Sequence, residues 1–420
     1  MNLKFARLKL AGFLIITAFT AACTEDLDNS AGCPALCPGQ GGEIETVTID
    51  AVTLDSTVSA LAGQGTETSL FVATRGDTID ARVIIRFDSI PDRYRKPGPD
   101  TATFEVTTVD SAFLRMRVDT TGGKIPATVT LDLYDVNSTA PDSAVAELAA
   151  LFTPARLITS VTFDKTALKD TINIPIPSEA ILARKAGALR IGIRARGPQS
   201  VQLRLLSQEG AGAPTVLSYR VSPDTTVAKV TLGPFSKTPA DQLILARSLA
   251  DYTLLVKGTA TGPQTELNIG GLPARRVYMR FNIPAFIIDS VDVVRATLLL
   301  TQQPNLTIDP QDTVRILPTV SLAAVAVTDI AKAAQINAVA NTDTLYVTPG
   351  GSGLKTLEVA NIVGVWRVQS AAETPRAIVL ISTLEGTSPL EARFYPVEAA
   401  PNLRPRLRIS YSARKSTGLP

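Results

Sequence analysis

An internal repeat is the feature that most constrains how this chain folds. The stretch RVIIRFDSIP at 82–91 returns as RRVYMRFNIP at 275–284, so Arg82 and Arg86 correspond to Arg276 and Arg280 at an offset of 194 residues. Three further pairs of segments follow in the same order, and the last pair ends at Tyr219 and Tyr411. Chance similarity between short strands would not keep its order along the chain, so the repeat predicts two copies of one folding unit.

Alternation of apolar and polar residues predicts that both copies consist of strands. Segments such as ATVTLDLYDV at 127–136 and RATLLLTQ at 295–302 carry apolar residues at nearly every second position, with Gly, Pro, Asp and Asn between the segments. This is typical of antiparallel sheets with one buried face. We therefore expect an all-β protein of two tandem antiparallel β-sandwich domains, jelly-roll-like, with a few short helices; helical patterns occur at 143–152, 178–187 and 321–338.

The first residues predict export and attachment to a membrane. A positively charged start is followed by an apolar run from 10 to 19, too short for a spanning helix, and by Ala21, Ala22 and Cys23. The arrangement resembles a bacterial lipobox, although Thr20 stands where that pattern prefers Leu. The resemblance implies that Cys23 is lipidated and that the protein is an exported, membrane-anchored lipoprotein of the periplasm or cell surface.

These patterns give a prediction for the whole chain. The expected parts are a signal peptide at 1–22, a lipid-anchored flexible tether at 23–45, β-sandwich domain 1 at 46–240, β-sandwich domain 2 at 241–413 and a C-terminal tail at 414–420. The tether is polar and contains Gly and Pro without periodicity, as flexible linkers do.

Residue types that are missing or scarce exclude several chemistries. The chain has no histidine, which excludes Ser-His-Asp and Cys-His catalysis, and no residue set forms a credible catalytic or transition-metal site. Cys33 and Cys37 are the remaining cysteines, and in an exported protein we expect them to form a disulfide. A net charge of +2 without a basic block argues against nucleic acid as a partner. We expect no cofactor; a structural calcium ion is the weaker alternative, at IDPQDT (308–313) and RGDTID (75–80).

Two groups of side chains are candidates for binding a ligand. On a strand, Arg82 and Arg86 share one face, as do Arg276 and Arg280, and such guanidinium pairs bind carboxylates or sulfates when they face outward. The alternative, favoured by the usual behaviour of strand arginines, is that they pair with neighbouring acids. Tyr94 and Tyr134 lie outside the matched strands and are the best candidates for exposed aromatic rings.

The second copy carries a family resemblance. Its segments VYMRFNIP (277–284), ATLLL (296–300), EVANIVGVW (358–366) and RPRLRISY (404–411) resemble the DNRLRE, or disaggregatase-related, β-sandwich domain. The first copy is more diverged and has no Trp, and the string that names the family is absent from the chain. The resemblance implies an accessory domain that binds or supports other molecules and does not catalyse a reaction.

Together these observations favour a non-enzymatic, lipid-anchored cell-envelope protein that acts as a structural or protein-interaction scaffold. The alternative is a carbohydrate-binding accessory protein of the cell surface, so the expected partners are the membrane, through the lipid, and an envelope protein or polysaccharide. A cluster of exposed aromatic rings on one sheet face would favour the glycan, whereas an exposed edge strand would favour a protein partner.

Overall fold

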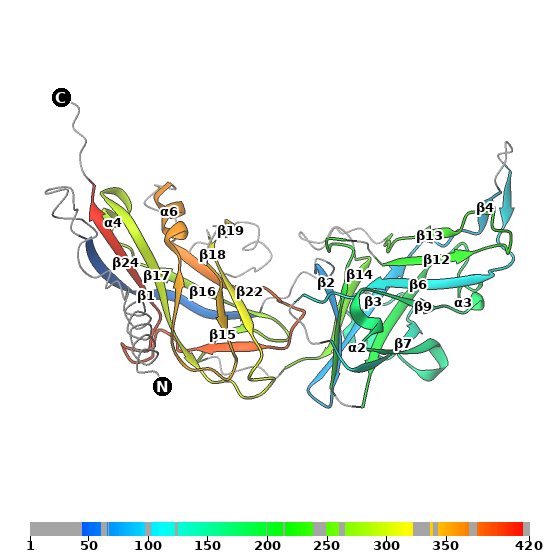
Figure 1. The fold of residues 1–420 in the computed structure, drawn as a ribbon, viewed down its shortest axis with the longest axis horizontal. Coiled ribbons are helices and arrows are strands. Elements are labelled where there is room, and N and C mark those ends of the chain that lie inside the picture. Colours follow the sequence, from blue (N-terminus) through cyan, green and yellow to red (C-terminus); the bar gives the residue numbers. More distant parts are fainter. Residues whose placement is uncertain are drawn as a thin grey trace, which may run out of the picture.

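The protein is an all-β molecule of two lobes, as the alternation predicts (Figure 1). The computed structural model describes residues 44–414 apart from the segments 60–64, 66, 97–101, 122–124, 199, 213–214, 238–248, 260–264, 322–336, 339–342 and 369–375. The predicted signal peptide, Cys23, Cys33, Cys37 and most of the predicted helix at 321–338 lie outside the described residues.

The first domain is a sandwich of a seven-stranded and a four-stranded sheet. The larger sheet has the order β11-β2-β3-β10-β7-β8 with β14 paired to β3, and the smaller has the order β13-β12-β6-β9; a separate hairpin, β4–β5, extends from the domain. The strands are β2 (Ser69–Arg75), β3 (Ile79–Phe87), β4 (Arg93–Arg95), β5 (Thr103–Glu105), β6 (Ser111–Arg117), β7 (Thr128–Asp135), β8 (Leu157–Asp164), β9 (Thr171–Pro175), β10 (Leu189–Arg196), β11 (Val201–Leu206), β12 (Val216–Arg220), β13 (Val230–Leu232) and β14 (Asp251–Lys257).

The core of this domain is built by strand alternation. In β6, Ala112, Leu114 and Met116 are buried while the residues between them are half-buried or exposed. They pack with alternate residues of β3, β7 and β10 in one apolar cluster between the two sheets. Burying a side chain of this size contributes about 1.5–3 kcal/mol, so this cluster is the main driving force for the fold of the domain.

The second domain is one large sheet that folds over its own core. Its order is β1-β24-β17-β23-β15-β16-β22-β18-β19, with β20 on β18, β21 on β17, and β1 also paired to β16. The elements are β1 (Ile44–Ser59), β15 (Leu267–Gly270), β16 (Arg275–Phe281), α4 (Ala285–Asp289), β17 (Val291–Gln303), β18 (Val314–Ser321), β19 (Asn337–Ala338), β20 (Leu345–Val347), β21 (Gly353–Glu358), α6 (Ala360–Val368), β22 (Ala377–Ser382), β23 (Glu391–Phe394) and β24 (Arg406–Ala413).

Helices play a small part in both domains. The helices predicted at 143–152 and 178–187 are observed as α2 (Val145–Ala149) and α3 (Ser178–Leu182), and 3-10 turns occur at η1 (Pro154–Arg156) and η2 (Ala167–Lys169). Trp366 of α6 is 2% exposed and belongs to the core of the second domain, so its ring is not available to a ligand. None of the helices within the described ranges is long and apolar enough to cross a membrane.

The strand order repeats between the two domains in the way the sequence repeat predicts. The series β11-β2-β3-β10-β7 corresponds to β23-β15-β16-β22-β18, and β12-β6-β9 corresponds to β24-β17-β21. Arg82 and Arg276 lie on the equivalent strands β3 and β16. The two domains therefore share one topology.

The two copies exchange their first strands. β1 precedes the first domain in the sequence but pairs with β24 and β16 of the second, so that Ile44 lies opposite Ser412 and Val58 opposite Arg276. β14 precedes the second domain in the sequence but pairs with β3 of the first, where Leu254 lies opposite Arg82. Figure 1 shows β1 and β2, both blue, in different lobes.

This exchange divides the chain differently from the predicted ranges 46–240 and 241–413. Residues 44–59 belong by their hydrogen bonds to the second domain, and 251–257 to the first. The physical reason is that a strand joins the sheet edge at which its backbone ladder can form, whichever domain its neighbours in the sequence belong to. The chain therefore crosses between the domains along more than one connection.

We predict that removing residues 44–59 unfolds the second domain selectively. The deletion opens the edges of β16 and β24, which expose backbone groups and the core beneath them. Hydrogen exchange should show lost protection in β16 and β24 while β3 and β10 remain protected, and a synthetic 44–59 peptide added in trans should restore it. A chain lacking 23–43 is the control and should keep protection throughout. Unchanged protection of β16 and β24 after the deletion would contradict the strand exchange.

Candidate functional site

The arginines of the repeated motif are paired with acids in the first domain. Arg82 donates to Asp80 at 2.7 Å and to the carbonyl oxygen of Ala149 in α2 at 2.9 Å, and its guanidinium lies 4.6 Å from the ring centre of Phe152. Arg86 donates to Asp142 at 2.8 Å. Both arginines are 7% exposed, so they are buried under α2 and its neighbouring residues and do not present a ligand-binding face.

In the second domain, Arg276 is also paired with an acid. Arg276 makes a two-pronged contact with Glu385, with Nε and Nη2 each 2.7 Å from a carboxylate oxygen. Arg280 is half-buried on β16. Their places in the two domains do not bring the four arginines together.

The two tyrosines singled out for exposure lie in different environments. Tyr134 is 8% exposed and packs against Phe152 with ring centres 5.2 Å apart, so the prediction that it is exposed is wrong, because α2 covers this face of β7. Tyr94 is half-buried on the β4–β5 hairpin, 5.9 Å from the ring of Phe104.

The two turns proposed for calcium have other partners. Asp80 pairs with Arg82, and Asp309 pairs with Arg75 at 2.9 Å. Within the described part of the chain, no group of three or more Cys, Asp or Glu side chains is arranged to hold a metal ion.

The contact between Arg75 and Asp309 belongs to a seam between the two domains. The outer face of β2 and β3 contributes Phe71, Ala73, Ile79 and Ala81, which form an apolar cluster with Leu272 and Ile308 of the second domain. The Arg75–Asp309 pair lies beside this cluster with about a third of each side chain exposed. We call this contact zone, defined by the apolar cluster and the ion pair, the seam.

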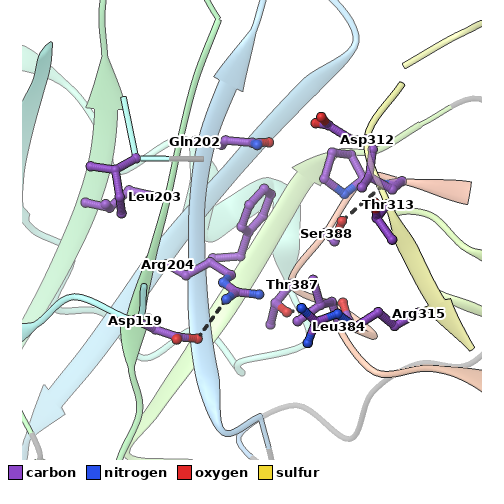
Figure 2. Close-up of a pocket in the computed structure, with 14 residues that line it drawn as sticks. Asp119, Gln202, Leu203, Arg204, Asp312, Thr313, Arg315, Leu384, Thr387 and Ser388 are labelled. Atoms are coloured by element: carbon purple, nitrogen blue, oxygen red, sulfur yellow. Dashed lines mark hydrogen bonds and ion pairs between the residues drawn. The ribbon is translucent and has the colours of Figure 1, made fainter. Parts of the chain in front are cut away.

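A cavity of about 320 Å³ opens at the seam and is lined by both domains. From β11, Gln202 and Arg204 point toward the second domain, while Leu203 points the opposite way (Figure 2). We call this cavity the seam pocket; its lining consists of Phe71, Asp119, Ile125, Gln202, Leu203 and Arg204 from the first domain and Asp312, Thr313, Arg315, Leu384, Thr387, Ser388, Pro389 and Leu390 from the second.

Arg204 is the most deeply buried charge in this pocket. Its side chain is 5% exposed, and Nη2 lies 3.2 Å from the Oδ2 atom of Asp119. Burial lowers the pKa of Arg204, the charge of Asp119 opposes that effect, and the charge of Arg315 adds to it. A guanidinium remains protonated in proteins, so the pocket holds a buried positive charge.

Asp119 is held in place by its own hydrogen bonds. Ser69 donates its hydroxyl to Oδ2 at 2.6 Å, and the backbone N–H of Thr121 donates to Oδ1 at 2.8 Å. Burial acts to raise the pKa of Asp119, but these bonds and the charge of Arg204 outweigh it and hold the pKa below its ordinary value. Asp119 therefore stays ionised near neutral pH.

The opposite wall of the pocket carries a second arginine and several hydroxyls. Arg315 is exposed on β18, and its guanidinium lies 5.6 Å from the ring centre of Tyr346 on β20. Thr387 is 7% exposed and donates to the carbonyl oxygen of Leu384 at 3.1 Å. Two cations, hydroxyls and an apolar floor can together bind a small polar anion. Sequence reasoning missed this pocket because nothing distinguishes Arg204 or Arg315 from other strand arginines.

A second group of titratable side chains lies inside the first domain. Asp251, at the start of β14, is 1% exposed and accepts the backbone N–H of Gln208 at 2.9 Å. Burial, with the negative charge of Glu209, raises the pKa of Asp251 to about 7, and burial likewise raises the pKa of Glu67 to about 7. We call Glu67, Glu209 and Asp251 the carboxyl cluster. Neither Glu67 nor Asp251 lines the seam pocket, so we consider the cluster for its effect on the free energy of unfolding.

Comparison with known proteins adds little. No family model matches the chain, and no curated protein matches it. A structure of T=1 particles derived from infectious bursal virus is 13% identical in sequence, with 89% of this chain and 74% of that chain covered, and the TM-score is 0.12. A likeness of this size carries no argument about fold or function.

We predict that Asp251→Asn stabilises the protein at alkaline pH and has little effect at pH 4. A raised pKa means that the folded state prefers the protonated carboxyl, so this contribution to stability is present below pH 4 and is lost as pH rises through 7. At pH 8 the variant should exceed the wild type by roughly 2–4 kcal/mol in free energy of unfolding, measured by urea denaturation.

Asp164→Asn is the matched control of opposite sign. Hydrogen bonds from Thr166 and Ala167 lower the pKa of Asp164, so its contribution is present at neutral pH and is lost on acidification. The control should therefore be less stable than the wild type at pH 8. An Asp251→Asn variant that is no more stable than the wild type at pH 8 would show that the cluster is solvated.

Proposed function

We propose that this protein is a non-enzymatic, lipid-anchored protein of the cell envelope that acts as a structural and protein-interaction scaffold. The observation that carries the proposal is the exchange of first strands, in which β1 completes the second domain and β14 completes the first. Two sandwiches joined in this way behave as one body, which is what a spacer or scaffold on a tether requires. The proposal includes the signal peptide at 1–22, lipidation of Cys23, the tether at 23–45 and the resemblance of both copies to the DNRLRE domain.

An exposed edge strand supports a protein partner. β8 ends the larger sheet of the first domain, and in the described part of the chain it pairs with β7 alone. Leu157 on this strand is 44% exposed, and Ile158, Val161 and Phe163 are partly buried. An edge of this kind offers unpaired backbone groups to which another chain can add a strand.

The distribution of aromatic rings also favours the scaffold over the carbohydrate-binding accessory protein. Among the described residues, the exposed rings are Phe104, Phe113, Phe235, Phe286 and Tyr346. They lie on β5, β6, α4, β20 and the segment after β13, and so are not gathered on one sheet face. Stacking against a polysaccharide requires such a gathered platform.

The scaffold proposal predicts a fixed distance between the two domains. In the fragment 40–420, which lacks all three cysteines, Phe113→Cys and Leu354→Cys place spin labels at exposed sites on the first and second domains. Pulsed electron resonance should give one narrow distance distribution, because the exchanged strands hold the domains together. A broad distribution, or one with several separate distances, in this fragment would contradict the proposal.

The anchor is tested separately. Cys23→Ala should abolish incorporation of labelled fatty acid and move the protein from the membrane fraction to the soluble fraction, since each buried methylene contributes about 0.8 kcal/mol to membrane binding. Cys33→Ala is the control, because it changes a nearby cysteine and should leave the protein in the membrane fraction. Incorporation of labelled fatty acid into the Cys23→Ala variant at the wild-type level would exclude lipid anchoring at this position.

A further inference from the structure

The seam pocket contains a buried cation whose hydrogen bonds are incomplete. Nε and Nη2 of Arg204 are buried and have no hydrogen-bond acceptor among the described residues. The 3.2 Å contact with Asp119 is an ion pair that balances charge without an aligned hydrogen bond. A buried donor left without an acceptor is unfavourable, so an acceptor that enters the pocket is favoured.

A second cation faces the same cavity from the other domain. Arg315 contacts no carboxylate among the described residues, and its recorded side-chain contact is with the ring of Tyr346. Burial is the main cause of the lowered pKa of Arg204, and the charge of Arg315 adds a smaller effect in the same direction. Two guanidiniums that repel each other are brought together by an anion placed between them.

The charge balance of the lining indicates a ligand with a single negative charge. Arg204 is paired with Asp119, whereas Arg315 has no carboxylate partner among the described residues, so the two cations leave one positive charge for a ligand to balance. A phosphate dianion would add two negative charges next to Asp119, which is ionised. A carboxylate adds one, and its planar pair of oxygens matches the fork of a guanidinium.

The remaining surface of the pocket fits a small polyhydroxylated body. Hydroxyls from Thr313, Thr387 and Ser388 lie on one side, and Phe71 and Leu384 provide an apolar floor. The volume of about 320 Å³ lies at the lower end of the range for small-molecule sites, a size that suits a single sugar ring.

We propose that the seam pocket binds a small sugar acid, with Arg204 and Arg315 holding its carboxylate and the hydroxyls of the second domain holding its ring. Such a ligand contacts β11 of the first domain and β18 of the second, so its binding stabilises the seam. The inference does not depend on the scaffold or on the lipid anchor, and its failure would leave both of those tests unaffected.

The test is calorimetric titration of the full chain with D-glucuronate, D-glucose, sulfate and phosphate. Glucuronate and glucose differ by a carboxylate in place of a hydroxymethyl group, so their comparison isolates the charge. We expect glucuronate to bind at least about tenfold more tightly than glucose, sulfate or phosphate. Binding of glucuronate and glucose with equal affinity would overturn the proposal, as would binding of sulfate or phosphate in preference to glucuronate.

Variants locate the site. Arg315→Gln removes an exposed charge whose side-chain contact is with the ring of Tyr346, and it should weaken glucuronate binding about tenfold. Arg204→Lys keeps the charge beside Asp119 but loses the guanidinium fork, and should weaken binding similarly. Arg408→Gln, at an exposed position of β24 outside the pocket, is the matched control and should change affinity by less than about twofold. Equal affinities in the Arg315→Gln and Arg408→Gln variants would show that glucuronate binds elsewhere.

Discussion

The hydrogen-bonded ladder between β1 and the strands β16 and β24 is the interaction on which the rest of the structure depends. It joins the first described strand of the chain to the last, with Ile44 opposite Ser412. Closing so long a stretch of chain costs conformational entropy that the ladder and the core beneath it must offset. Because β14 makes the reciprocal contact with β3, neither domain is complete as a continuous segment of its own repeat copy.

The exchange of first strands explains why the seam can include an ion pair and a cavity beside its apolar cluster. The apolar cluster of Phe71, Ala73, Ile79 and Ala81 with Leu272 and Ile308 is small compared with either domain core. The Arg75–Asp309 pair is partly exposed, and pairs of that kind contribute at most about 1 kcal/mol. The exchanged strands hold the domains together by covalent connection and backbone pairing, so the seam itself does not have to be tightly packed. A pocket with a buried, incompletely bonded Arg204 is tolerated there for that reason.

Much of the fold could be predicted from the sequence, because alternation and repetition are local signals. The pattern of β6 places Leu114 and Met116 inward, and the repeat identifies β3 with β16. The strand exchange could not be predicted, since alternation identifies a segment as a strand but does not say which sheet edge the strand joins. Tyr134 was misplaced because its burial depends on Phe152 of a segment that folds back over β7. Arg204 and Arg315 are far apart in sequence, and the packing of the two domains against each other brings them to one cavity.

The repeated Arg-x-x-x-Arg motif has different consequences in the two copies. In the first, Arg82 and Arg86 are covered by α2, and their charges are matched by Asp80 and Asp142. In the second, Arg276 reaches Glu385, which lies in the loop between β22 and β23.

That loop also supplies Leu384, Thr387 and Ser388 to the seam pocket. A two-pronged guanidinium–carboxylate contact fixes both position and orientation, so Arg276 holds the residues on either side of Glu385 against the cavity. In the second copy, the ion pair between Arg276 and Glu385 therefore supports one wall of the seam pocket. Arg276, which the sequence indicated as a candidate ligand contact, acts on the pocket indirectly by positioning this loop.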